Sequence, residues 1–319
     1  MSKVSVIIPT YNRAHLVRET IESVLKQTYR EFEVIVVDDG SSDDTSRIVH
    51  SYGGCVRYLY RENGGQGAAR STGIRAARGE YIAFLDSDDL WTPTKLERQM
   101  SYLARNPAAP FVYCDAEYFD DESGRLLYRS SQLLRLYEGH DVGGRLLVNN
   151  FVPAASPVVK RAVFEKVGYF DEDRLLQGSE DWEMWLRIAA RYPLAVVREP
   201  LARYRLHRGN MVGSGGRAPI GWCKRRVAVI ERAVAFAPDV YRPFYHRAMS
   251  ATYLETAKFL LEGGSNSQAR VMLHKAMLHK PCSWKIYLFW VLTFAGSATA
   301  RVLKKIYYSL RGVSELPVG

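Results

Sequence analysis

Segments rich in apolar residues alternate with amphipathic segments along the first ninety residues. The apolar segments have the length of strands and lie at 4–8, 33–37, 56–60 and 81–85. Between them, apolar side chains recur at helical spacing at 17–28, 43–50 and 66–78. Strands that are apolar along most of their length are covered on both faces, and helical connections this short make neighbouring strands parallel. The pattern therefore predicts an α/β fold, a Rossmann-like and mostly parallel central sheet with helices on both faces.

The pattern continues less regularly beyond residue 90. Apolar spacing predicts, in chain order, a helix at 95–106, strands at 111–119 and 157–159, and a helix at 161–167. At 182–189 two tryptophans recur at helical spacing, which favours a place for them in the core. Residues 120–150 are polar and irregular, so we expect either a flexible loop that meets the acceptor or a plain surface loop, of which the second is the commoner.

Polar or glycine-rich clusters follow each of the first four predicted strands. They begin at Asn12, Asp38, Asn63 and Asp86. In an open α/β sheet ligands bind beyond the carboxyl ends of the strands, so these clusters mark one sheet edge as the expected site. A dinucleotide-binding Rossmann domain carries its glycine fingerprint directly after the first strand, where this chain has residues 9–12, Pro-Thr-Tyr-Asn. The sequence thus argues against a dinucleotide-dependent oxidoreductase.

Three carboxylates follow the fourth strand. Asp86, Asp88 and Asp89 stand so close together that they repel one another unless a cation lies between them. A hard divalent ion such as Mg²⁺ or Mn²⁺ takes oxygen ligands of this kind. The alternative is structural, because Asp88 or Asp89 could cap a helix that Pro93 opens.

The basic excess of the chain lies entirely in its last third. Residues 1–216 carry 28 Lys and Arg against 29 Asp and Glu, whereas residues 217–319 carry 16 against 5. This part is expected to meet an anionic surface, either nucleic acid or the headgroups of a membrane. The four cysteines show no metal-ligand spacing and the N-terminus shows no secretory signal, so we expect reduced thiols in the cytoplasm.

Six separated motifs together resemble the inverting glycosyltransferases of family 2, which have the GT-A fold of nucleotide-diphospho-sugar transferases. The motifs are VIIPTYNR at 6–13, VVDDGSSD at 36–43, NGGQGAARSTG at 63–73, DSDD at 86–89, EDW at 180–182 and YRLHRGN at 204–210. Each is weak alone, and their order and spacing make the set specific. The resemblance ends near residue 210 and implies a glycosyltransferase that acts on a nucleotide-sugar donor.

The resemblance assigns the donor nucleoside to the first two motifs. Pro9 and Tyr11 would line the nucleoside pocket, with Asn12 beside them among the donor-binding residues, and the tyrosine ring can lie on a base. Asp39 would accept a hydrogen bond from a base N3–H. Uracil and thymine have that donor and cytosine does not, so the resemblance implies a UDP-sugar or a dTDP-sugar.

The diphosphate and a metal ion are assigned to the next motifs. Gly67 and Arg70 would lie at a helix N-terminus, where a pyrophosphate binds favourably. Asp86 would touch the ribose or the metal region, and Asp88 would ligate Mn²⁺ or Mg²⁺. His207 would complete the metal or diphosphate site, although a lone histidine is often only structural.

The chemistry of transfer is assigned to the fifth motif. Asp181 would be the general base that takes the proton of an acceptor hydroxyl, and the attack would invert the anomeric carbon. Glu180 and Trp182 would belong to the nucleotide-sugar site. Without the resemblance, Glu180 and Asp181 are explained as the favourable acidic start of a helix.

The C-terminal third predicts helices and a membrane contact. We expect a catalytic domain at 1–215, a helical region at 216–281 with one tetratricopeptide-like helix pair, and a basic amphipathic helix and tail at 282–319. The apolar segment at 286–300, which opens the region at 286–310, is too short and too polar to span a bilayer. It fits a helix on the anionic inner face of the cell membrane, with a buried core helix as the alternative.

The leading hypothesis is a metal-dependent transferase that adds a sugar to a glycan or a polyprenyl-linked acceptor in surface polysaccharide or glycolipid assembly. A nucleotidyltransferase would have the same acids at the strand ends, but it also requires a glycine-rich, lysine-bearing loop at the first strand, and this sequence has no such loop there. A non-catalytic helical scaffold is the third reading. The basic third contains no recognisable nucleic-acid-binding module, so no nucleic-acid partner is expected.

Overall fold

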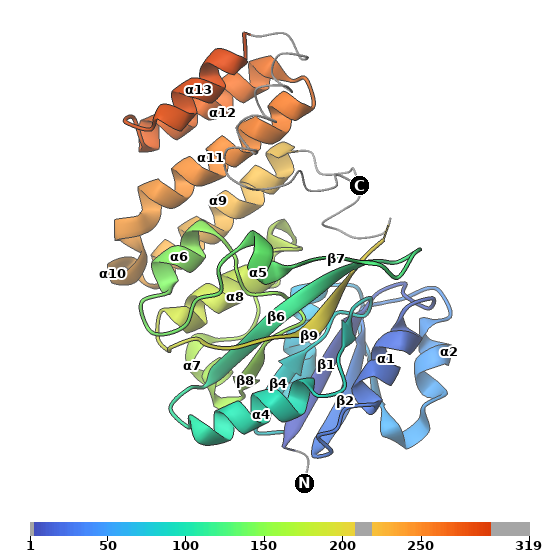
Figure 1. Cartoon of the computed structure of the whole chain (residues 1–319). Helices are drawn as coiled ribbons and strands as arrows, with labels where there is room; N and C mark the ends of the chain where they lie inside the picture. The colour runs from blue at the N-terminus through green and yellow to red at the C-terminus, as the bar shows by residue number, and fades with distance from the viewer. Residues whose placement is uncertain (1–2, 208–218, 295–319) are drawn as a thin grey trace. The chain divides into compact units, whose positions relative to one another are not determined.

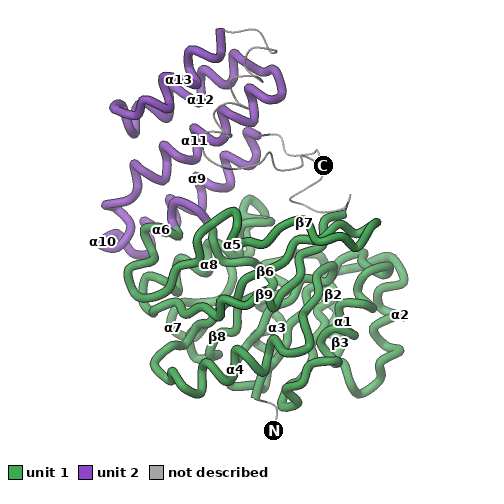
Figure 2. The backbone as a smooth tube through the Cα atoms, viewed as in Figure 1, with its two compact units in different colours: residues 1–146, 150–210 green, residues 147–149, 211–319 purple. Residues whose placement is uncertain are grey.

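The computed structural model describes residues 3–207 and 219–294 and divides the chain into two compact units (Figure 1). Unit 1 comprises residues 1–146 and 150–210, and unit 2 comprises residues 147–149 and 211–319 (Figure 2).

Unit 1 begins with an alternation of strands and helices. The elements are β1 (Val4–Thr10), α1 (Val17–Leu25), β2 (Phe32–Asp38), α2 (Thr45–His50), β3 (Arg57–Tyr60), α3 (Gln66–Ala76) and β4 (Tyr81–Phe84). Strand β1 pairs in parallel with β2 and β4, and β2 pairs in parallel with β3. The predicted strands and helices of this part are confirmed, and so is the parallel half of the sheet.

The second half of the sheet is mixed. It contains β5 (Leu90–Trp91), β6 (Phe111–Asp120), β7 (Leu126–Arg129), β8 (Val158–Lys160) and β9 (Ala195–Leu206). Strand β8 joins β4 to β6 with antiparallel pairing on both sides, whereas β6 and β9 are parallel. The strand order is β3-β2-β1-β4-β8-β6-β9-β5, with β7 paired to β6 (Figure 1). The structure is therefore an α/β fold with a mixed, mostly parallel sheet.

Two expectations from the sequence are wrong. Residues 120–150 are not a plain surface loop, because they contain β7 and the short helices α5 (Ser130–Leu133) and α6 (Gly143–Val148). The strand was missed because its four residues are too few to show an alternating pattern. It pairs antiparallel with β6, and Tyr128 stacks on Tyr118 of that strand with ring centroids 4.7 Å apart. Nor do the aspartates at 86–89 cap a helix, since β5 follows them and α4 (Lys95–Arg105) begins only after Thr94.

The core covers both faces of the sheet. On one face, Val6 and Ile8 of β1 belong to the same apolar cluster as Val17 and Ile21 of α1. On the other face, aromatic rings from β4, the loop after α7 (Ala162–Val167) and α8 (Glu180–Ala189) pack together. Phe84 has its ring centroid 5.3 Å from that of Phe170 and 5.9 Å from that of Trp185. Both faces are apolar, which fits the apolar strands of the sequence.

Unit 2 is helical. Its elements are α9 (Pro219–Phe236), α10 (Pro238–Tyr241), α11 (Tyr245–Glu262), α12 (Asn266–His279) and α13 (Trp284–Leu292). The expected helix pair is α11 and α12, which share an apolar core that includes Ala257, Leu260, Leu273 and Ala276. None of the helices in the described part of the chain is long and apolar enough to cross a membrane. Of the helix expected at 286–310, residues 295–310 lie outside the described residues.

We expect Gly79→Ala to lower the free energy of unfolding by about 1–3 kcal/mol. A Cβ atom at this position would lie 2.7 Å from the backbone nitrogen of Ser5 and 2.8 Å from the carbonyl carbon of Val4. Backbone atoms of a central strand cannot rotate away, so β1 has to shift. Urea unfolding followed by circular dichroism measures the change. Gly54→Ala is the matched control, because nothing lies within 4 Å of its Cβ position; equal stability of the two variants would contradict the argument.

Candidate active site

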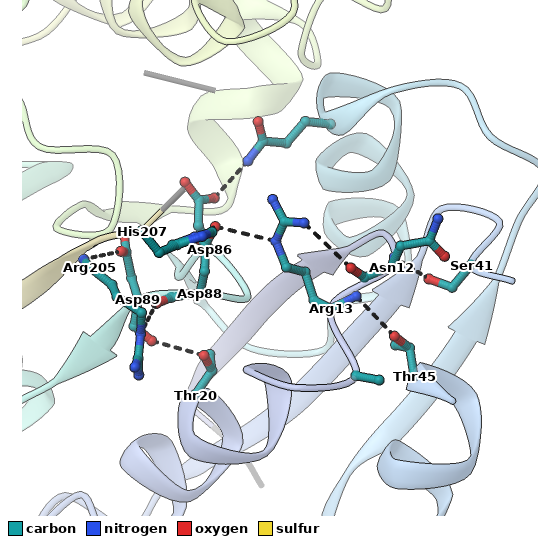
Figure 3. Close-up of polar contacts among 12 residues, drawn as sticks. Asn12, Arg13, Thr20, Ser41, Thr45, Asp86, Asp88, Asp89, Arg205 and His207 are labelled. Atoms are coloured by element: carbon teal, nitrogen blue, oxygen red, sulfur yellow. Dashed lines mark hydrogen bonds and ion pairs between the residues drawn. The ribbon is translucent and has the colours of Figure 1, made fainter. Parts of the chain in front are cut away.

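The strand ends of unit 1 converge on one cluster of polar side chains (Figure 3). Asn12 follows β1 with a φ of 50°, in the left-handed region that asparagine tolerates. Its backbone N–H donates to Ser41 Oγ over 2.8 Å, and its side-chain oxygen accepts from the backbone N–H of Ser42 over 2.8 Å. The loops after β1 and β2 are thereby tied together. Tyr11 is half exposed beside them, whereas Pro9 is buried within β1.

Asp39 organises the loop that follows β3. Its Oδ1 accepts from Arg61 over 2.5 Å and from the backbone N–H of Gly64 over 3.0 Å. Its Oδ2 accepts from the backbone N–H of Gly65 over 2.7 Å. The carboxylate is buried, so these donors replace the water that it loses. Sequence reasoning missed Arg61, because nothing in the motif at 63–73 shows which cation will meet this aspartate.

Arg70 of α3 lies at the centre of a buried ion network. Its guanidinium donates to Asp86 over 2.6 Å and makes a short contact with Glu180. Gln66 donates a further hydrogen bond of 2.9 Å to the same oxygen of Asp86. Burial and the charges of Asp88 and Glu180 raise the pKa of Asp86, while Arg70 opposes the rise. The arginine thus joins the end of β4 to the start of α8.

Gly67 explains how the arginine reaches both acids. A Cβ atom at this position would collide with the backbone carbonyl oxygen of Asp171 and lie 3.5 Å from Cγ of Glu180. Only a glycine lets the first turn of α3 pack this closely against the segment that leads into α8. The second oxygen of Glu180 accepts from the backbone N–H groups of Gly178, over 2.6 Å, and Ser179, over 3.1 Å.

Asp181 lies beside the network at the start of α8. Burial and the neighbouring charge of Glu180 raise its pKa to about 7, against the opposing charge of Arg70. A carboxyl group with such a pKa exchanges a proton readily near neutral pH. The ring of the next residue, Trp182, is buried, and its indole N–H donates to the carbonyl of Leu146 over 2.8 Å. That place is typical of a core side chain, and it supports packing rather than contact with a sugar.

Asp88 meets two nitrogen-bearing side chains. Its Oδ2 lies 3.1 Å from Nε2 of His207 and 3.4 Å from Nε of Arg13 (Figure 3). Burial raises its pKa, but the hydrogen bond of His207 and the charge of Arg13 outweigh this and hold the pKa of Asp88 below its ordinary value. The carboxylate is therefore ionised at neutral pH. His207 follows β9, so the sheet itself brings these two residues together from 119 positions apart.

Arg205 of β9 holds the acidic turn in place, and sequence reasoning missed its role. Its backbone N–H donates to Asp89 over 3.0 Å, and its Nε donates to the carbonyl of Asp88 over 2.8 Å. The rest of the guanidinium pairs with Asp121 and Glu19, each over 2.6 Å. Thr20 donates to the carbonyl of Asp89 over 2.9 Å. The acids after β4 are thus fixed by side chains from α1 and β9.

The described residues contain no group of three or more His, Cys, Asp or Glu side chains arranged to hold a metal ion. Asp88 and His207 offer one carboxylate oxygen and one imidazole nitrogen, a donor pair that suits Mn²⁺ and partly suits Mg²⁺. One oxygen of the neighbouring Asp89 is buried without a hydrogen-bond partner among the described residues, so the turn offers an oxygen atom whose bonding capacity is unused. These residues fit a divalent ion that takes its other ligands from a bound molecule.

Solved structures resemble the chain in fold. The structure of S. aureus TarS in complex with UDP-GlcNAc matches with a TM-score of 0.63 at 18% identity, over 95% of this chain and 92% of that one. The mannosyltransferase PcManGT from Pyrobaculum calidifontis, in complex with GDP-Man and Mn²⁺, matches with a TM-score of 0.62 at 22% identity, over 97% and 80% of the two chains. Together with the sheet order, these likenesses show the GT-A fold.

Curated relatives agree with one another. An uncharacterised glycosyltransferase of Rickettsia typhi is 36% identical over 205 residues, which is 64% of each chain. The UDP-Glc:α-D-GlcNAc-diphosphoundecaprenol β-1,3-glucosyltransferase of Escherichia coli is 41% identical over 122 residues, which is 38% of this chain and 48% of that protein. The matched part thus spans about two thirds or less of these relatives. The sequence profile described as glycosyl transferase family 2 matches residues 5–168, and the chain belongs to this family of glycosyltransferases.

Proposed function

We propose that the chain transfers a sugar, with inversion, from a UDP-sugar or dTDP-sugar to a hydroxyl group of a glycan or lipid-linked acceptor. The observation that carries the proposal is the bridge that Arg70 makes between Asp86 and Glu180. It joins Asp86, which follows β4, to the start of α8, which carries Asp181. One site can therefore bind a donor diphosphate and accept the proton of an acceptor hydroxyl.

The donor nucleoside is proposed to bind between Tyr11 and Asp39. The half-exposed tyrosine ring offers a face for a base, and Asp39 offers an acceptor for the N3–H of uracil or thymine. Because Asp39 is paired with Arg61, the base N–H would replace the Arg61 donor or use a remaining lone pair of the carboxylate. The printed ligand of the TarS structure, UDP-GlcNAc, supports a uridine donor.

Asp88 and His207 would hold Mn²⁺ or Mg²⁺ against the diphosphate of the donor. Such an ion would offset the charge that develops on the leaving nucleoside diphosphate. The printed Mn²⁺ of the PcManGT structure supports this assignment. Arg13, which already contacts Asp88, would add a second positive charge at the same place.

Asp181 would be the general base. Its carboxylate would accept the proton of the acceptor hydroxyl while that oxygen attacks the anomeric carbon from the face opposite the diphosphate. The raised pKa of Asp181 suits this task, since a base with a pKa near the working pH takes the proton efficiently. Glu180 and Arg70 hold the start of α8 and thereby position Asp181.

A lipid-linked acceptor is favoured by the name of the E. coli relative, which specifies a diphosphoundecaprenol acceptor. Such acceptors lie at a membrane, so we propose that the enzyme works on the cytoplasmic face of the cell membrane in surface polysaccharide or glycolipid biosynthesis. Neither a nucleotidyltransferase nor a non-catalytic scaffold is favoured, because the chain belongs to a glycosyltransferase family.

We expect Asp181→Asn to reduce transfer at least about 100-fold, because general-base assistance contributes 10²–10⁴-fold. Donor binding should change little, since the amide keeps the size of the side chain. Thermal shifts with UDP-, dTDP- and GDP-sugars in the presence of Mn²⁺ measure binding, and release of the nucleoside diphosphate measures turnover. The control is Asp44→Asn, because Asp44 is an exposed aspartate directly before α2. Undiminished turnover in Asp181→Asn would remove this residue from the role of base.

The transfer rate of the intact enzyme should rise with pH up to about 7 and then level off. Below this pH the carboxyl group of Asp181 is protonated and cannot accept a proton, so the rate should fall about tenfold for each pH unit. Single-turnover rates at saturating donor and acceptor test this. A transfer rate that does not change between about pH 5 and pH 8, a range that includes the pKa of Asp181, would contradict the assignment.

Chelation by EDTA should stop turnover, and Mn²⁺ should restore it. Asp88→Asn should need a higher Mn²⁺ concentration for half-maximal rate, because the amide removes the negative charge of one ligand. Titration of the rate with Mn²⁺ gives both values. Full activity in the presence of chelator would refute the metal assignment while leaving the base assignment standing.

A further inference from the structure

Helix α13 of unit 2 is apolar on both of its faces. Ile286, Phe289 and Leu292 are buried in the core that α11 and α12 share. The opposite face carries Trp284, Tyr287 and Val291, and Phe294 continues this spacing of three or four residues in the turn after the helix; all four are exposed. Trp284, Val291 and Phe294 each expose 60% or more of their surface. A helix needs only one apolar face to pack in a bundle, so this second face is available for another contact.

Helix α13 and the neighbouring α12 contain basic residues and no Asp or Glu. Lys275 lies on α12, Lys280 follows the end of that helix, and Lys285 lies on α13. The guanidinium of Arg270 lies 4.9 Å from the ring centroid of Phe294. The sequence contains no Asp or Glu between Glu262 and Glu315. Basic residues around exposed tryptophan, tyrosine and aliphatic side chains are the composition of a surface that meets anionic lipid.

We infer that the exposed face of α13, together with the lysines of α12 and α13, binds the surface of a bilayer that contains anionic lipid. Trp284 and Tyr287 combine an apolar ring with a polar group, and such side chains prefer the level of the headgroups. The nine residues of α13 are about 14 Å long, far less than the thickness of a hydrocarbon core. The helix would therefore lie in the interface, with its buried face still packed on unit 2.

Two other occupants of the face fit less well. The remaining segment of this chain, 295–319, carries four Lys and Arg against one Glu, so it has the same sign of charge as the rim of the face. A second copy of the chain would bring an equally basic rim, and like charges would face each other. Anionic headgroups would pair with the basic side chains of α12 and α13, and the headgroup level is the one that the aromatic rings of α13 prefer.

The inference concerns unit 2 and does not depend on the residues of the active site. It would bring the enzyme to the place where a lipid-linked acceptor is found. Vesicle binding is measured without donor or acceptor, so a failure of the inference and a failure of the proposed transfer can be told apart.

The test is co-sedimentation of the full chain with vesicles of phosphatidylcholine, with and without phosphatidylglycerol. We expect binding to the anionic vesicles and at least about tenfold weaker binding to the neutral ones. Val291→Ser with Phe294→Ser should weaken anionic binding at least about tenfold by removing apolar contact. Leu126→Ser with Leu133→Ser, two exposed leucines of unit 1, is the matched control and should leave binding unchanged.

Charge reversal gives a second, independent measurement. Lys280→Glu with Lys285→Glu should weaken anionic binding about tenfold or more, whereas Lys3→Glu with Lys26→Glu makes the same change of net charge on unit 1 and should have little effect. If both pairs weaken binding equally, net charge rather than this face is responsible, and the inference fails.

Tryptophan fluorescence identifies the contact itself. Trp290, the other tryptophan of α13, is 39% exposed and has its ring centroid 4.9 Å from that of Phe294. Lipids with brominated acyl chains should quench the fluorescence of the full chain, and Trp284→Phe with Trp290→Phe should lose most of that quenching. If acrylamide cannot reach these two tryptophans in the absence of lipid and the chain sediments as a monomer, its own segment covers the face. If it sediments as a dimer that vesicles do not dissociate, a second copy covers it. Either result overturns the inference.

Discussion

The buried guanidinium of Arg70 is the constraint on which the candidate site depends. A cation taken out of water costs several kcal/mol unless anions and hydrogen bonds replace its hydration, as Asp86 and Glu180 do here. Burial lowers the pKa of Arg70, but the charges of Asp86, Glu180 and Asp181 outweigh this and raise it, so the group stays charged. The acids in turn tolerate burial because this charge lies among them. Neither side of the network would be stable where it is without the other.

The environment gives the aspartates of the site different properties. Asp88 is held ionised by His207 and Arg13, which suits a ligand for a cation. Burial and the charges of Asp88 and Asp86 raise the pKa of Asp89 well above its ordinary value, while Arg205 opposes the rise. Asp89 accepts a hydrogen bond from the backbone of β9 and thereby holds that strand in place. Burial and the charge of Glu180 raise the pKa of Asp181 to about 7. Pairs of acidic groups whose surroundings separate their pKa values are typical of sites that move protons.

The sequence predicted the parts of the fold that depend on local pattern. The apolar segments of β1, β2 and β4 were recognisable, and the rule that ligands meet the carboxyl ends of parallel strands indicated where the polar cluster of the candidate site forms. Strand β9 was missed, because charged residues and Pro200 interrupt its apolar pattern and the register with β6 shifts beside Asp115. The contact of Arg205 with Glu19 joins residues 186 positions apart, and no local pattern contains such information. The same holds for Arg61 and Asp39, and for pKa values that depend on burial.

Gly67 has a consequence for how this chain can change over evolutionary time. The first turn of α3 touches the carbonyl of Asp171 so closely that no larger side chain fits there, and Arg70 lies one turn further along the same helix. A bulkier residue at 67 would push the helix outward and pull the guanidinium away from both of its acids. Packing alone therefore restricts which residue can occupy position 67, although glycine carries no reactive group. A residue without a side chain is thus as restricted as the charged residues around it.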